Sequence, residues 1–496
     1  MTKLFLIVFF VSTVALLMVP ALAGGGDVFV ITLLLISTVI LMTAWCKLIW
    51  AERPAPVYFF TLVYLVLGLV VPALYQAPTA TFFWPSSATD MGLIRQAGVL
   101  FLLSSIAFLV GHGSLKTLKP PKRPAVAQAA DVGAREEVAV LVMAVAAVLF
   151  AVYTVEKQGL ATFFSPREEA GRLLTAQMSS LAETGLTFLA TRGYAVGALV
   201  VTLAVWTRRP GSLLVWIALG LLLATNAVVN FPLSLPRSEM AAIVLSCLLV
   251  VLPGSLKYIY RMSCLMPVVV YLIFPMVAQI NRKSNFNFNI TIPTLQNTMV
   301  FGDFDGFQSL VNAVMYVQQR GIHFGMNVLS ALLFFIPRTF WTQKEQPAGL
   351  MAGLNAGYKF LTVAMPLPGE FYVDFGLFGA IVGMYLTGRG VKWLDLNFEA
   401  KSASDRTNPV FLVAVFIAVY ATVLMRGSLL GVIKSPAVDC GAVMLFWLLS
   451  RGPRVAFTVQ RTLQGSSGRF GGPGGYQPGG YGTRARRATE PAGPAE

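Results

Sequence analysis

The chain has 496 residues, of which 56% are hydrophobic and only 12% are charged, and its formal net charge is +15. Soluble proteins carry about a quarter charged residues, so the composition excludes a soluble fold. Much of the positive charge lies in short loops and in the C-terminal tail, which indicates membrane topology and not nucleic-acid binding. The sequence therefore predicts an all-α fold, a polytopic transmembrane helical bundle.

Apolar runs of roughly 20 residues recur along the chain, and each is long enough to cross a bilayer core of about 30 Å. We expect about twelve spans. In chain order they cover roughly 4–23, 28–46, 56–75, 92–111, 138–154, 186–206, 211–230, 239–253, 264–281, 371–388, 409–425 and 438–450. The first run ends in Ala21-Leu22-Ala23, which resembles a signal-peptidase site. Because the run is long for a signal peptide, we favour a retained span.

The distribution of Lys and Arg gives these spans an orientation. With the N-terminus in the cytoplasm, each loop that would be cytoplasmic carries basic residues, whereas the opposite loops at 24–27 and 76–91 carry none. The basic residues of the cytoplasmic loops are Lys47, Arg53, Lys116, Lys119, Lys122, Arg123, Arg135, Arg208, Arg209, Lys257, Arg261, Arg389, Lys392, Lys401 and Arg406. The short outer loops hold three exceptions, Arg237, Arg426 and Lys434. The bias places both termini in the cytoplasm.

Two outer loops are long, at about 155–185 and 282–370, and loops of such length are usually functional. The longer loop contains the apolar run GMNVLSALLFFIP at 325–337, which is too short to span a membrane comfortably. If it spanned, the basic loop at 389–406 would face outward, so we predict a short re-entrant or interfacial helix instead.

These boundaries divide the chain into four parts. Transmembrane helices 1–9 lie within 1–281, the large outer loop is 282–370, and helices 10–12 lie within 371–450. Residues 451–496 are expected to form a disordered, basic cytoplasmic tail, because a Gly/Pro/Arg-rich composition cannot bury enough apolar surface to fold.

Arginines on the outer face are the first candidates for a functional site. They are Arg167, Arg172, Arg237, Arg282, Arg320, Arg338 and Arg426. A guanidinium group matches phosphate geometry with two parallel hydrogen bonds, so such a group suits a lipid-linked phosphate or pyrophosphate. The alternative is that they reach to lipid headgroups or pair with Glu168, Glu169 and Glu183. For Arg237 and Arg338 we favour function, since each follows a Pro at the edge of an apolar segment.

The same loop supplies acids and one histidine. His323 faces outward, and Glu370 and Asp374 lie in PGEFYVDFG at the mouth of a span, where a half-buried acid or imidazole can act as a general base. The alternative for His323 is a hydrogen-bonded packing residue. For Asp303 and Asp305 in FGDFDGF we favour helix capping or turn formation over divalent metal binding, because two acids without a third ligand are a weak signal.

Other motifs are missing from the sequence. There is no GxxxxGK[ST], GxSxG or HExxH sequence, and the four cysteines show no CxxC spacing. We therefore predict no metal and no cofactor, and we do not expect ATP-driven transport by this chain alone.

Three segments carry a resemblance to a known family. They are FGDFDGFQSLVNAVMYV at 301–317, GMNVLSALLFFIPRTFWTQK at 325–344 and PLPGEFYVDFGLFGAIVG at 366–383. In particular, an apolar run that ends in Pro-Arg, followed by an acid-aromatic-x-x-Phe-Gly entry to a span, resembles the bacterial O-antigen polymerases, the Wzy-type oligosaccharide repeat-unit polymerases. The likeness covers under a fifth of the chain.

The resemblance implies an enzyme of the bacterial inner membrane. Its substrate would be an undecaprenyl-pyrophosphate-linked glycan, which it would transfer on the periplasmic side from one lipid carrier to a new lipid-linked repeat unit. Membrane lipids are expected partners, a polysaccharide chain-length regulator is left open, and no nucleic acid is expected.

The expected site residues follow from the resemblance and from position. As catalytic residues we expect Arg338 and Glu370, carried over from the motifs, together with Arg237 and His323 from their position and chemistry. As substrate-binding residues we expect Arg167, Arg172, Arg320, Lys344, Tyr372 and Asp374. Two alternatives stay open: an O-antigen ligase-like glycosyltransferase, and a lipid-linked oligosaccharide flippase or exporter component. The position of the candidates on one face argues against the flippase.

Overall fold

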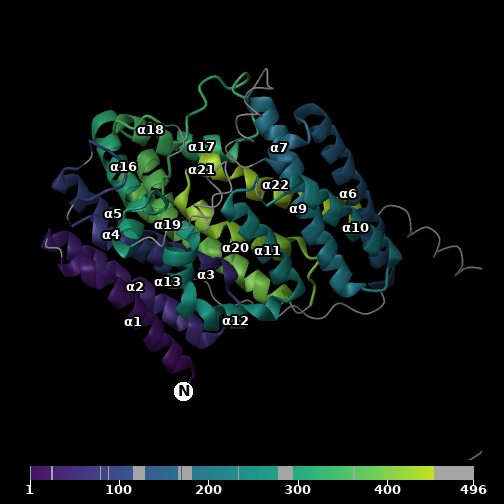
Figure 1. Cartoon of the computed structure of the whole chain (residues 1–496), viewed down its shortest axis with the longest axis horizontal. Coiled ribbons are helices and arrows are strands. Elements are labelled where there is room, and N and C mark those ends of the chain that lie inside the picture. The colour runs from purple at the N-terminus through teal and green to yellow at the C-terminus, as the bar shows by residue number, and fades with distance from the viewer. Residues whose placement is uncertain are drawn as a thin grey trace, which may run out of the picture. The chain divides into compact units, whose positions relative to one another are not determined.

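The computed structural model describes residues 2–451 apart from 24–25, 79, 88, 115–128, 166–168, 170–180, 233, 277–293, 361–362 and 403 (Figure 1). Residues Met1–Ser450 form one compact unit. Within the described residues every regular element is a helix, and the one β-bridge pairs Ala364 with Gly427. The prediction of an all-α fold is confirmed. The predicted tail from residue 452 onward lies outside the described residues.

Eight helices of the described part are long and apolar enough to cross a membrane. They are Val28–Ala51, Pro56–Gln76, Met91–Gly113, Gly133–Gln158, Ala190–Arg208, Pro253–Met276, Leu367–Ser402 and Pro409–Arg426. Two shorter apolar helices cover Lys3–Val19 and Leu213–Val229. The count of twelve spans therefore remains a prediction.

The helices follow the predicted runs closely in the first half of the chain. Their bounds are α1 (Thr2–Ala23), α2 (Val28–Ala51), α3 (Pro56–Val63), η1 (Tyr64–Val70), α4 (Val71–Gln76), α5 (Met91–Gly113), α6 (Ala129–Gln158), α7 (Ala161–Phe164), α9 (Leu181–Arg208), α10 (Leu213–Val229) and α11 (Arg237–Val251). The residues between the predicted spans 239–253 and 264–281 are also helical. The segments there are η3 (Pro253–Ser255), α12 (Leu256–Arg261), η4 (Met262–Leu265), α13 (Met266–Val268) and η5 (Val269–Ile273).

In the second half, the described part of the predicted loop at 282–370 contains several short helices beside the one that we expected. Its described elements are α15 (Leu295–Met299), η6 (Gly302–Phe304), α16 (Gly306–Arg320), α17 (Met326–Leu332) and α18 (Ala348–Asn355). They are followed by α19 (Leu367–Ser402), α20 (Pro409–Arg426), α21 (Leu429–Val432) and α22 (Lys434–Arg451). At seven residues, or about 10 Å, α17 is too short to span. Whether it dips into the membrane remains a prediction.

α16 is buried from Gly306 to Tyr316, and it packs against α19, α18 and α5. The sequence did not reveal this helix because its buried face is partly polar. Gln308 exchanges hydrogen bonds with the backbone of Trp84, at 3.2 Å and 2.5 Å. Asn312 donates to the Tyr358 hydroxyl at 2.9 Å. These bonds join α16 to the loop before α5 and to the segment after α18.

The closest crossing in the unit is that of α5 with α19. A Cβ at Gly388 of α19 would overlap the carbonyl oxygen of Phe108, and one at Gly111 of α5 would overlap that of Tyr385. The two glycines therefore let the helix backbones touch, as small residues do between membrane helices. Elsewhere, α6, α9 and α10 pack against one another, and α20 packs against α3 and α11.

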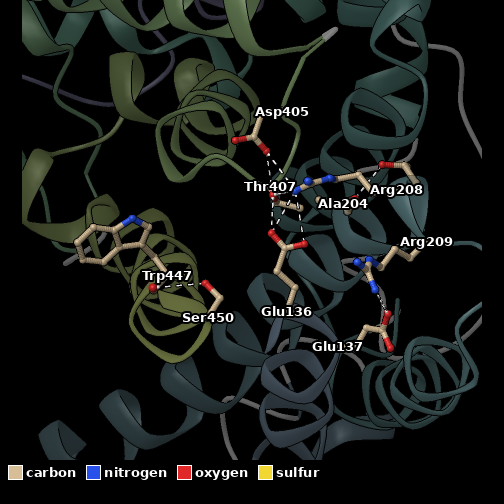
Figure 2. Close-up of polar contacts among 10 residues, drawn as sticks. Glu136, Glu137, Ala204, Arg208, Arg209, Asp405, Thr407, Trp447 and Ser450 are labelled. Carbon is tan, nitrogen blue, oxygen red and sulfur yellow. Dashed lines mark hydrogen bonds and ion pairs between the residues drawn. The ribbon is translucent and has the colours of Figure 1, made fainter. Parts of the chain in front are cut away.

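Polar contacts between the loops fall into two groups. Figure 2 shows one group, in which Glu136 accepts hydrogen bonds from Arg208 at 3.1 Å and Thr407 at 3.2 Å, while Glu137 accepts from Arg209 at 2.7 Å. All of these residues lie at or beside loops that we expect to be cytoplasmic. The contacts described below join expected outer loops to one another. We call the end of the second group of contacts the outer end; its orientation in a membrane remains a prediction.

Replacing Gly388 by alanine should destabilise the fold, because the added methyl group would overlap the backbone carbonyl of Phe108. Overpacking of this kind costs about 1–3 kcal/mol. The melting temperature of the purified protein in detergent measures the effect. Gly390→Ala is the matched control, since a Cβ there meets nothing within 4 Å. Equal melting temperatures for the two variants would contradict the close crossing.

Candidate functional site

The predicted acids lie together in the first turns of α19. Glu370 and Asp374 are four residues apart, so they lie on one face of the helix. Both side chains are buried. The helix then breaks at Gly376, whose φ of +67° is a conformation that favours glycine. The short segment before the break carries both acids.

Each acid binds the start of a different short helix. Asp374 accepts hydrogen bonds from the backbone N–H of Asn327 at 3.1 Å and of Val328 at 2.8 Å, at the start of α17. Glu370 accepts from the Ser428 hydroxyl at 2.6 Å and from the Leu429 N–H at 2.8 Å, at the start of α21. A carboxylate at this position satisfies N–H groups that have no partner within the helix. The two acids therefore hold α17 and α21 in place.

The loop after α17 folds back onto its own helix through Lys344 and Arg338. The Lys344 ammonium group donates to the carbonyls of Leu333, Phe334 and Ile336 at 3.0, 2.8 and 2.9 Å. Arg338 donates to the carbonyls of Lys344 and Glu345. All three N–H donors of Lys344 are thus used within the loop. Lys344 would therefore attract an anion through its positive charge and not through a hydrogen bond.

His323 lies between α16 and α17 and contacts two side chains. Its Nδ1 is 3.2 Å from Oε1 of Glu345, and its Nε2 is 2.8 Å from the Tyr316 hydroxyl. A carboxylate beside Nδ1 favours the tautomer with the proton on Nδ1, which leaves Nε2 as the acceptor. A histidine oriented by a carboxylate in this way is the arrangement of a general base.

Three basic side chains form a cluster beside His323 and Glu345. We call Arg338, Lys344 and Lys434 the cation cluster. Burial lowers the pKa of Lys344, and the nearby charges of Arg338 and Lys434 lower it further. Burial and the charge of Arg338 likewise lower the pKa of Lys434, the first residue of α22. Positive charges that repel one another in a partly buried place would be stabilised by an anion.

A pocket of about 410 Å³ opens on the other side of Tyr316. It is lined by Tyr316, Arg320, Met351, Leu354 and Asn355, from α16 and α18. The Arg320 guanidinium donates to the Asn355 side chain at 3.4 Å. The pocket offers an aromatic ring, an amide and a cation, which is suitable chemistry for a sugar.

Two other outer arginines pair with the acids of FGDFDGF. Arg237 binds Asp303 at 3.1 Å, and Arg426 binds Asp305 at 3.1 Å. Asp305 also accepts from the Trp84 indole N–H at 3.0 Å, and its side chain does not cap α16. Asp305 thus lies at the N-cap position of α16, after the turn η6, as the capping or turn interpretation expects, but its carboxylate binds other partners. Among the described residues, no three His, Cys, Asp or Glu side chains gather as a metal site would require.

The structure thus brings together some of the predicted residues and separates others. Arg338, Lys344 and His323 meet through Glu345, next to the helix ends that Glu370 and Asp374 hold. Arg237 belongs to the Asp303 pair, Arg320 lines the pocket, and Tyr372 is half-buried on α19. Arg167 and Arg172 lie outside the described residues.

Sequence reasoning missed Glu345, Tyr316 and Lys434. Glu345 directly follows the quoted motif, and its carboxylate could have been found as the nearest acid to Arg338 in the sequence. Lys434 was noted only as an exception to the charge bias. A basic residue that breaks this bias indicates a possible functional site, since membrane topology disfavours a positive charge at that position.

Comparison of the chain with protein families, with curated proteins and with solved structures finds no match.

Inorganic pyrophosphate should raise the melting temperature of the purified protein, because the cation cluster lacks a counter-charge that a dianion supplies. A ligand present at about 100 times its Kd stabilises a protein by about 2.7 kcal/mol. Lys434→Met should remove most of the shift. Lys401→Met, a change at the other end of α19, should retain it. The same shift in both variants would rule out the cluster as the binding place.

Proposed function

We propose that the chain is a membrane glycosyltransferase whose donor is a lipid-linked diphosphate sugar. Within this class we propose an oligosaccharide repeat-unit polymerase of the O-antigen type, at the periplasmic face of the bacterial inner membrane, with about twelve spans. The observation that carries the proposal is His323, oriented by Glu345, beside the cation cluster. A general base and a diphosphate site are the two components that this reaction needs.

The proposed reaction joins two lipid-linked glycans. A sugar hydroxyl of the acceptor attacks the anomeric carbon of the donor, and the bond from that carbon to the diphosphate oxygen breaks with its electron pair. His323 takes the hydroxyl proton at Nε2, where the acceptor hydroxyl replaces that of Tyr316. Arg338 and Lys434 stabilise the charge that develops on the leaving lipid diphosphate.

The pocket next to Tyr316 is the place for the acceptor sugar. Tyr316 both lines this pocket and contacts His323, so a sugar bound there brings a hydroxyl within reach of Nε2. Arg320 then hydrogen-bonds the sugar and limits its orientation. A hydroxyl held in this way reacts faster, because its approach is already fixed.

Exposed apolar side chains near the cation cluster support a lipid-linked substrate. They are Phe324, Leu329, Leu332, Phe335 and Phe340, on and around α17. Such a group of exposed apolar residues suits contact with lipid. A carrier whose tail lies in the bilayer would reach Arg338 with its diphosphate from this side.

Replacing Arg338 by alanine should lower chain lengthening by about 10²–10³, the usual cost of losing one group that stabilises a developing anion. Lysine should rescue it poorly, because it lacks the two-pronged geometry of guanidinium. The assay follows glycan length on a purified, defined lipid-linked repeat unit. Full activity of Arg338→Lys would count against the diphosphate contact. Transfer of the glycan to lipid A without lengthening would favour a ligase. Movement of the lipid-linked glycan across the membrane without transfer would favour a flippase.

Replacing His323 by alanine should lower the rate by about 10²–10⁴, which is typical for loss of a general base. Glu345→Gln should cause a smaller loss, because the imidazole stays in place while its favoured tautomer is no longer set. Gln346→Ala, in the same loop, serves as the control for loop folding. If His323→Ala stays active, the base is another group, and Glu370 is the next candidate.

A further inference from the structure

Asp439 of α22 is a fully buried acid without a hydrogen bond of normal geometry. Its side chain has 0% exposure, neither carboxyl oxygen makes a hydrogen bond of normal geometry with the described residues, and the hydroxyl that faces it is that of Tyr420. It plays no part in the proposed glycosyl transfer. An ionisable residue in the interior of a membrane bundle is costly and usually functional.

The surroundings of Asp439 come from three other helices. On α9, a Cβ at Gly193 would lie 3.1 Å from Oδ1 of Asp439, so the glycine backbone closes one side. The titratable groups that face it are Glu239 of α11 and Tyr420 of α20, together with Cys440, the next residue of α22. None of these three groups is a cation, and the cation Arg192, the residue before Gly193 on α9, interacts electrostatically with Glu239.

Two other buried acids, unlike Asp439, accept hydrogen bonds from backbone N–H groups. Asp395 accepts hydrogen bonds from the backbone N–H of Val57 at 2.9 Å and of Tyr58 at 3.0 Å, at the start of α3. Asp374 is held in the same manner by α17. The N–H groups of a helix start give each of these two acids donors to accept from. Asp439 has no such support, and an unpaired charge at its position would cost several kcal/mol.

Asp439 also has a polar connection toward the outer end. Ser435 lies one helical turn before it on α22, and its hydroxyl donates to Oε1 of Glu239 at 3.3 Å. Glu239 is half-buried, at the start of α11, and interacts electrostatically with Asp439. Lys434 of the cation cluster is the residue before Ser435. Glu239 is therefore the half-buried acid that interacts both with Asp439 and with Ser435, near the start of α22.

We propose that Asp439 is a proton-binding site, and that its proton exchanges with the outer face through Glu239. The ligand is a proton because a single buried carboxylate, with no further acid gathered into a metal site among the described residues, offers too few ligands for a metal ion. The neutral acid then needs no counter-charge. Glu239, which reaches both the surface and α22, accepts the proton from Asp439 and passes it outward. The proposal is independent of the glycosyl transfer.

Infrared spectroscopy tests the site on the full chain, purified in an ester-free detergent. A protonated carboxyl group has a C=O stretch that is separate from that of a carboxylate, and it shifts when the proton is replaced by deuterium. Aspartate labelled with heavy carbon in its side-chain carboxyl group distinguishes this band from glutamate bands. We expect the band in the wild type and in Asp395→Asn, and its loss in Asp439→Asn. A band that survives in Asp439→Asn, or one that is lost in Asp395→Asn, overturns the proposal.

Two further measurements keep the test decisive. Asp439→Asn should melt at the wild-type temperature, because a neutral amide has the shape of a protonated acid; a large drop would mean that the native group is charged and paired. In Glu239→Gln the band should remain, but its shift after transfer to heavy water should be slower. Exchange at the wild-type rate in Glu239→Gln overturns the route through Glu239.

Discussion

The first turns of α19 carry Glu370 and Asp374, and each of them receives hydrogen bonds from the start of another helix. The candidate site depends on this constraint. α17 leads into the loop that contains Arg338 and Glu345, and α21 leads into α22, whose first residue is Lys434. One short helical segment thus fixes both sides of the cation cluster. A carboxylate is well suited to this task, because each buried helix start presents N–H groups that need an acceptor.

The helical class and most of the long apolar helices could be predicted, because a span must be apolar over about 20 residues and the chain shows that pattern directly. α16 could not be predicted. Its buried Gln308 and Asn312 are satisfied by Trp84 and Tyr358, which are distant in sequence, so the polar residues look like those of a surface loop. Lys257 and Arg261 lie in α12 although their charge indicates a loop, because both are on its exposed side.

The site could be predicted in part. Residue type and position pointed to Arg338, Lys344 and His323, which the fold does bring together. Their individual contacts could not be foreseen, because they depend on a loop that folds back across a short helix. Lys344 serves three carbonyls of that loop, and Glu345, without a distinctive motif, is the residue that contacts His323. Asp303 and Asp305 pair with arginines of distant helices, which no local pattern encodes.

The break of α19 at Gly376 affects how the protein responds to the bilayer itself. A continuous helix would pass any tilt of its membrane-crossing part to the segment that carries Glu370 and Asp374. Helices tilt to match their apolar length to the thickness of the surrounding lipid, and membranes differ in thickness by several Å. Because the backbone leaves the helical path at Gly376, the angle between the two segments can adjust there. The outer segment keeps its hold on α17 and α21 while the rest of α19 adapts to hydrophobic mismatch.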